Sequence, residues 1–259
     1  MKRILLQVAI ALAVGSAAAM TVEEAKAFMT KSRSRFLSAA SYHIDYTTTA
    51  KGVPTESRCW IRRDPQKGVS ILNESQVMPF GFPMPKITQL ATGGKVYLIS
   101  ALAPQKALHL TFADGTIHSD VFCEFFTDRG TVKPLSDGAG KCVIQFTPSA
   151  AELLQMGEQA ISAAGPISLA NGFVPAAFRY TFLKPSGDIS EIACLDKQGQ
   201  AIVTVVVSKL ELNAQVSDSY FALPKGCKVI DLKSAAELAN SLGDLLPGAF
   251  GKQPAAKAK

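Results

Sequence analysis

Apolar residues follow two different spacings along the chain, one typical of helices and one typical of strands. Over residues 21–38 they form a stripe at helical spacing, and Thr21 with Glu24 three residues later is the signature of a capping box at a helix start. Over residues 42–47 apolar and polar residues alternate instead. This alternation is typical of a strand that buries one face.

Further strands are predicted where short apolar runs stand between turns rich in glycine, proline or aspartate. Two more capping-box signatures, at 149–152 and 234–237, predict helices over about 150–164 and about 234–246. This order predicts an α+β, mainly β fold: a strongly curved antiparallel sheet, forming an incomplete, half-open β-barrel, with helices covering the concave face. The strands are expected at about 55–63, 67–74, 86–91, 95–100, 105–112, 120–127, 141–147, 176–183, 188–195 and 201–212.

The first nineteen residues are typical of a secretory signal peptide. Lys2 and Arg3 precede an apolar run over residues 4–14, and small residues at 17–19 allow cleavage after Ala19. The run is shorter than the ~20 residues that span a bilayer, which argues against a retained membrane anchor. We therefore expect a signal peptide (1–19), a single folded domain (20–250) and a disordered basic tail (251–259). The mature protein is expected to be exported to the periplasm.

The formal net charge of +6 comes mostly from the two ends of the chain. Lys2 and Arg3 leave with the signal peptide, and three lysines belong to the tail, which leaves about +1 for the body. Nucleic-acid-binding proteins gather Lys and Arg on one face, often with aromatic residues between them. The sequence shows no such pattern, so we expect no nucleic-acid partner.

Five cysteines in an exported chain suggest disulfide bonds, with one thiol left over. Cys123 and Cys142 form the preferred pair, because a Gly/Pro/Asp-rich turn region at 129–140 could fold them back together. No CxxC motif occurs and the three histidines lack tight ligand spacing. We therefore expect no metal and no cofactor.

An enzyme would need a nucleophile with a base, or paired carboxylates in a pocket. No G-x-S-x-G motif occurs, and the carboxylates are scattered over turns and helix starts. The sequence therefore predicts a protein that is not an enzyme.

Four segments follow the pattern of a known family in the same order along the chain. They are Cys-Trp-Ile-Arg-Arg-Asp-Pro at 59–65, Thr-Gly-Gly-Lys-Val-Tyr-Leu-Ile at 92–99, Leu-Asp-Lys-Gln-Gly-Gln at 195–200, and Asn213 followed by Tyr-Phe-Ala-Leu-Pro-Lys-Gly-Cys-Lys-Val at 220–229. In these segments the chain resembles the periplasmic lipoprotein carrier LolA and its relatives in the outer-membrane lipoprotein-sorting superfamily. Asp64 before Pro65, and Gly93 in place of an aspartate, depart from the family pattern.

The resemblance implies a non-enzymatic carrier, a half-open barrel with a helical lid whose apolar interior receives acyl chains of lipoproteins or lipids. Such a chaperone works as a monomer, taking cargo from an inner-membrane release complex and passing it to an outer-membrane acceptor. The family's gating arginine, which bonds to the lid, matches Arg63, with Arg62 as the alternative because of the inserted Asp64. The alternative functions are an envelope sensor of lipids or lipoproteins and a small-lipid-binding protein of the same fold.

An acyl chain of about fifteen methylenes costs roughly 12 kcal/mol to expose to water, so a carrier must cover it with apolar side chains. Methionine and aromatic residues suit a pliable lining. The proline-rich run 77–85 is therefore interpreted as a cavity mouth or, alternatively, as a buried core loop. For Arg63, the alternative to a gating role is a solvated strand end or a surface salt bridge. The candidate lipid-binding residues are Trp60, Met78, Phe80, Phe82, Met84 and Tyr97.

Overall fold

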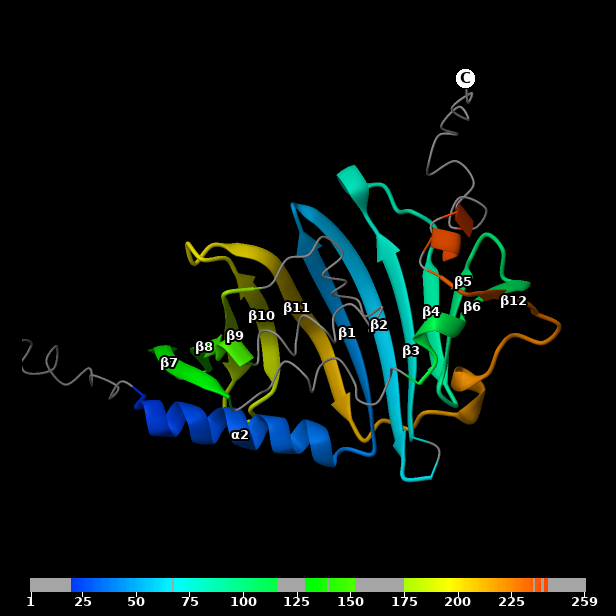
Figure 1. The fold of residues 1–259 in the computed structure, drawn as a ribbon. Helices are drawn as coiled ribbons and strands as arrows, with labels where there is room; N and C mark the ends of the chain where they lie inside the picture. Colours follow the sequence, from blue (N-terminus) through cyan, green and yellow to red (C-terminus); the bar gives the residue numbers. More distant parts are fainter. Residues whose placement is uncertain are drawn as a thin grey trace, which may run out of the picture.

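A computed structural model describes residues 20–66, 68–115, 129–138, 140–151, 175–234, 236–238 and 240–241 of the chain. One sheet contains the twelve strands of these residues (Figure 1). The strands are β1 (Ser41–Ala50), β2 (Val53–Asp64), β3 (Gly68–Val77), β4 (Ile87–Thr92), β5 (Lys95–Ser100), β6 (Lys106–Leu110), β7 (Gly130–Asp137), β8 (Lys141–Pro148), β9 (Ala177–Leu183), β10 (Ile189–Leu195), β11 (Ala201–Leu212) and β12 (Lys228–Leu232). The helical elements include α2 (Val22–Ser38) and the short 3-10 helices η1 (Pro79–Gly81), η2 (Thr111–Ala113) and η3 (Asp218–Phe221).

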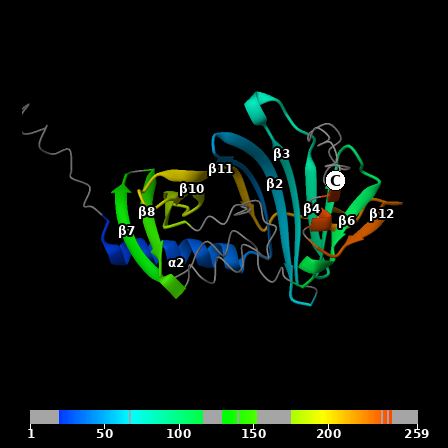
Figure 2. The ribbon, with the colours of Figure 1, turned by 45° about the horizontal axis from the view of Figure 1, so that its top comes forward.

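The sheet is open, with the strand order β12-β6-β5-β4-β3-β2-β1-β11-β10-β9-β8-β7. Neighbouring strands are antiparallel except β12, which runs parallel to β6. Among the described strands, β7 and β12 form the two edges and do not pair with each other. The long strands β1, β2 and β11 bend across the middle of the sheet (Figures 1 and 2). The predicted fold class, a mainly β protein with a curved and unclosed antiparallel sheet, is confirmed.

Helix α2 begins at the predicted capping box. The Thr21 hydroxyl accepts a hydrogen bond from the Glu24 amide at 3.2 Å, and the Glu24 carboxylate accepts one from the Thr21 amide at 2.7 Å. These bonds satisfy amides that have no partner within the helix, and they lower the pKa of the Glu24 carboxyl. The helix lies along the half of the sheet that ends in β7 (Figure 1).

Strand alternation gives the sheet two different faces. We call the face that packs against α2 the inner face; on β1 it carries Tyr42, Ile44 and Tyr46, all nearly fully buried. The helix contributes its own apolar side to the same core. The buried members of this inner core are Ala25, Met29, Phe36, Tyr42, Ile44, Tyr46, Cys59, Ile61, Ile71, Ala91, Val132, Cys142, Ile144, Phe146, Phe178, Tyr180, Phe182, Ile189, Ile192, Cys194 and Val205.

The opposite, outer face is covered over β2–β6 by residues 213–227, which we call the outer-face segment. This segment connects β11, in the middle of the sheet, to β12 at the edge. Its Val216, Phe221 and Leu223 pack on a second apolar cluster. On the sheet side that cluster contains Trp60, Leu72, Leu90, Tyr97, Ile99 and Ala107.

The prediction of turns over residues 129–140 is wrong, because most of this region is strand β7. As an edge strand, β7 tolerates Gly130 and Pro134. The sequence prediction also missed β12, which is short and lies directly after the outer-face segment. The predicted strand 120–127 lies outside the described residues, as does most of the predicted helix 150–164.

Candidate functional site

Arg63 connects the sheet to the C-terminal end of α2. Its Nη1 donates hydrogen bonds to the carbonyl oxygens of Phe36 at 2.6 Å and Ala39 at 2.5 Å, and its guanidinium lies 5.4 Å from the centre of the Tyr42 ring. The last carbonyls of a helix lack partners within it and carry the negative end of the helix dipole. A cation at this position therefore stabilises the end of α2 against the sheet.

Arg62 points to the outer face instead. It forms an ion pair with Asp218 of η3, and its guanidinium lies 4.8 Å from the centre of the Phe221 ring. Consecutive residues of a strand face opposite sides, so only one of the two arginines can reach the helix. In the structure that residue is Arg63.

Two further polar side chains of α2, Ser32 and Arg35, contact the β9–β10 turn from the same half of the helix. The Ser32 hydroxyl donates to the Gly187 carbonyl oxygen at 2.7 Å, and Arg35 contacts the Ser186 carbonyl and Asp188. In the first half of the helix the Phe28 ring packs edge to face against the Phe182 ring, with the ring centres 5.4 Å apart. The helix–sheet interface, α2 against β1, β2 and β7–β10, thus has a polar end and an apolar end.

Aromatic side chains give this interface a hydrocarbon-like environment on the sheet side. Phe146, Phe178, Tyr180 and Phe182 are almost completely buried. Burial raises the pKa of the Tyr180 phenol well above its usual value. Burial also raises the pKa of the Cys194 thiol to about 12, so this thiol stays protonated. Such surroundings favour apolar groups and disfavour charged ones.

Two of the predicted lipid-binding residues lie on the outer face. The Trp60 ring is parallel to the His43 ring at 4.8 Å and contacts the Tyr220 ring at 5.3 Å. The Tyr97 ring stacks on His109 at 5.0 Å. Both belong to the cluster under the outer-face segment, so they do not meet α2.

The proline-rich run 77–85 lies beyond the ends of β2 and β3, at the top of Figure 1. Backbone bonds hold its two ends: the Met78 amide donates to the Pro54 carbonyl at 2.9 Å, and the Met84 amide to the Val77 carbonyl at 2.8 Å. Phe82 is 75% exposed at its tip, whereas the side chain of Phe80 lies outside the described part of the structure. Of the predicted lipid contacts, Phe82 at this tip is therefore not brought together with Trp60 and Tyr97.

The predicted disulfide is not tested by the structure, because Cys123 lies outside the described residues. Cys142 lies on β8 with its side chain fully buried in the inner core, and burial raises the pKa of its thiol. The Cys123–Cys142 bond stays a prediction.

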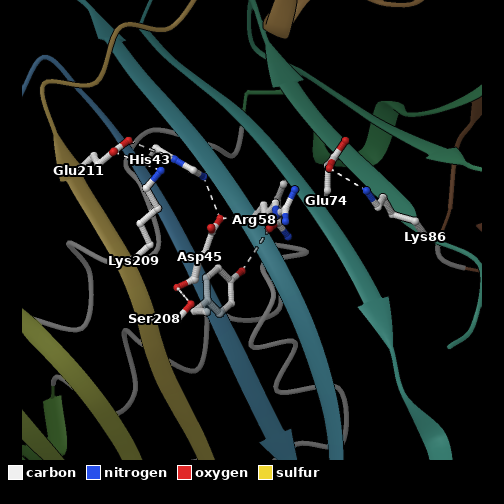
Figure 3. Close-up of polar contacts among 10 residues, drawn as sticks. His43, Asp45, Arg58, Glu74, Lys86, Ser208, Lys209 and Glu211 are labelled. Atoms are coloured by element: carbon white, nitrogen blue, oxygen red, sulfur yellow. Dashed lines mark hydrogen bonds and ion pairs between the residues drawn. The ribbon is translucent and has the colours of Figure 1, made fainter. Parts of the chain in front are cut away.

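Sequence reasoning missed a polar groove of about 350 Å³ on the outer face (Figure 3). The Asp45 carboxylate, part of its lining, lies 3.9 Å from Nε of Arg58. It also lies 2.8 Å from His43, which is outside the lining. Lys86 pairs with Glu74 at 3.0 Å. The alternation on β1–β3 could have indicated these outward positions, but not that they share a groove. The lining thus holds the cations Arg58 and Lys86 beside the carboxylates Asp45 and Glu74, and such partly exposed pairs contribute at most about 1 kcal/mol each.

The two histidines that the structure describes, His43 and His109, both lie beside carboxylates. Neither contacts a Ser, Thr or Cys side chain of the described residues. No group of three or more potential metal ligands occurs in the same residues. Within the part of the chain that the structure describes, no helix combines the length and apolarity needed to cross a membrane.

No family model matches the chain, and no curated protein matches it. Solved structures do: LprF from Mycobacterium bovis has 14% identity and a TM-score of 0.46 over 82% of this chain and 100% of its own. MucB of Pseudomonas aeruginosa, in a structure with MucA, has 11% identity and a TM-score of 0.47 over 81% of this chain and 64% of its own, so this chain spans less than two thirds of MucB. A domain named for outer-membrane lipoprotein sorting, from Vibrio parahaemolyticus, has 8% identity and a TM-score of 0.36 over 78% of this chain and 97% of its own.

A structure named for outer-membrane lipoprotein sorting is thus among the solved structures to which this chain is similar. Identities of 14% or less and TM-scores below 0.5 transfer no function to this chain. What this chain does must therefore be inferred from its own residues.

Proposed function

We propose that this protein is a non-enzymatic carrier of the periplasm that binds acyl chains of lipoproteins or lipids between α2 and the inner face of the sheet. It takes this cargo from an inner-membrane release complex and delivers it to an outer-membrane acceptor. The observation that carries the proposal is the helix–sheet interface, which is apolar at one end and held by a few polar contacts at the other.

The energies of the two parts of the interface suit reversible opening. A charge-assisted hydrogen bond contributes about 1.5–3 kcal/mol net, so the bonds of Arg63 can hold the end of α2 in place. Covering an acyl chain of about fifteen methylenes contributes roughly 12 kcal/mol. Cargo binding can therefore offset the loss of apolar contacts between helix and sheet, while Arg63 keeps the polar end attached.

The first experiment identifies the cargo. The mature protein is purified from its native periplasm without detergent, and bound molecules are analysed by mass spectrometry. We expect acylated proteins or lipids in near-stoichiometric amounts. Acylated proteins support the lipoprotein carrier, and free lipids alone favour the small-lipid-binding alternative. Protein that carries neither, and that does not bind a fluorescent fatty-acid probe, would contradict the proposal.

The second experiment tests the role of Arg63. Arg63→Leu removes both hydrogen bonds to α2, and we expect cargo to enter but to be transferred to an acceptor at least tenfold more slowly. Arg62→Leu is the matched control: it removes a charge one residue away, on the outer face, and should transfer normally. Equal transfer by both variants, with unchanged melting curves, would show that Arg63 has no gating role.

A further inference from the structure

Three lysines gather where β6 and β12 begin, at one edge of the sheet. In the parallel register of these strands Lys106 lies directly opposite Lys228, and both are exposed. Lys225 lies in the turn just before β12, and the adjacent Gly226 approaches Gln105 of the β5–β6 turn. We call Lys106, Lys225 and Lys228 the basic edge. Like charges placed opposite each other destabilise a sheet, so this arrangement costs stability without helping the fold.

Two acidic residues near these lysines in the sequence, one in η3 and one in β12, pair with other residues. Asp218 pairs with Arg62, and the Asp231 carboxylate lies 2.8 Å from Nδ1 of His109. Both contacts are on the outer face. Among the residues that the structure describes, no carboxylate lies within ion-pairing distance of the basic edge. Its positive charge is therefore not neutralised within this part of the protein.

An exposed apolar side chain accompanies the three lysines. Leu102, in the β5–β6 turn, is 52% exposed, and the same turn leads into Lys106. Lysines with a nearby exposed leucine are the combination that peripheral proteins use on anionic membrane surfaces, where the charges attract and the apolar group inserts. A free anion would gain nothing from Leu102.

We propose that the basic edge docks the protein on an anionic lipid surface. Each lysine near such a surface strengthens binding about fivefold, so the three together contribute about a hundredfold at low salt. Docking through this edge leaves the edge formed by β7, at the other end of the sheet, away from the membrane. The inference goes beyond the carrier function and stands without it, because no cargo is required for docking.

The test is co-sedimentation of the mature, cargo-free protein with vesicles of phosphatidylcholine and phosphatidylglycerol, and with vesicles of phosphatidylcholine alone. We expect binding only to the anionic vesicles, weakened by salt because the contact is electrostatic. The variant Lys106→Gln/Lys225→Gln/Lys228→Gln should bind about a hundredfold more weakly. Leu102→Ser should weaken binding further without changing its dependence on salt.

Two control variants have the same change of charge. One is Lys252→Gln/Lys257→Gln/Lys259→Gln, in the tail, and the other is Lys26→Gln/Lys133→Gln/Lys141→Gln, on α2, β7 and β8. Both should bind as the unmodified protein does, and no variant should melt at a lower temperature than that protein. The proposal is overturned if the unmodified protein does not bind, if the basic-edge variant binds equally well, or if the tail variant accounts for the loss. Competition by inorganic phosphate at low concentration would indicate a simple anion site. Stronger binding to polyglutamate than to vesicles would indicate an acidic protein partner. Either result overturns docking on lipid.

Discussion

Phe36→Ala is expected to lower the free energy of unfolding by about 3–5 kcal/mol, the usual cost of removing a fully buried aromatic ring. Phe36 is 1% exposed at the end of α2, and its ring lies edge to face with Tyr42 at 5.8 Å. Its loss leaves a cavity in the inner core beside the carbonyls that Arg63 binds. Urea unfolding followed by circular dichroism measures the change.

Leu37→Ala is the matched control, because the next residue on the same helix is 49% exposed. It should change the free energy of unfolding by less than about 0.5 kcal/mol, as surface substitutions usually do. A similar loss for both variants would mean that α2 does not pack on the sheet through the side described above.

Gly130→Ala is expected to destabilise the protein by about 3 kcal/mol through overpacking. A Cβ at this position would lie 2.4 Å from the Thr147 carbonyl oxygen and 2.6 Å from the ring of Phe146. The ring is fully buried and the oxygen belongs to the backbone of β8, so neither can move away easily. Thermal unfolding should show a clearly lower midpoint.

The control for this substitution is Gly140→Ala, in the turn between β7 and β8. A Cβ there meets no atom within 4 Å. Its unfolding midpoint should stay close to that of the unmodified protein. If Gly130→Ala is equally harmless, β7 cannot pair with β8 in the register described.

Local patterns in the sequence predicted the elements well where a few neighbouring residues determine them. The capping box at Thr21 set the start of α2, and the run over 201–212 coincides with β11. Edge strands were harder to predict, because β7 contains a glycine and a proline that signal turns in most contexts. An edge position removes the penalty, and only the complete sheet reveals which strands lie at an edge.

Assigning residues to the two faces of the sheet was harder still. Alternation along β2 separates Trp60 and Arg62 from Ile61 and Arg63, but it does not say which set meets the helix. The outer-face segment covers Trp60 and Tyr97 on the far side because it passes over β2–β6 on its way from β11 to β12. Such a long connection has no periodicity, so the sequence alone placed both aromatic residues with the lipid contacts.

The central position of β1 has a consequence for the order in which the sheet can form. β1 pairs with its neighbour β2 through a tight hairpin, but its other partner is β11, and the bonded residues Ala40 and Asn213 are 173 positions apart. Because a chain is synthesised from its N-terminus, β1 must therefore wait for β11 before the middle of the sheet can close. Until then β1 presents an open strand edge, the feature that most readily templates aggregation. Such high contact order slows folding, which makes the nascent protein a natural client of holding chaperones.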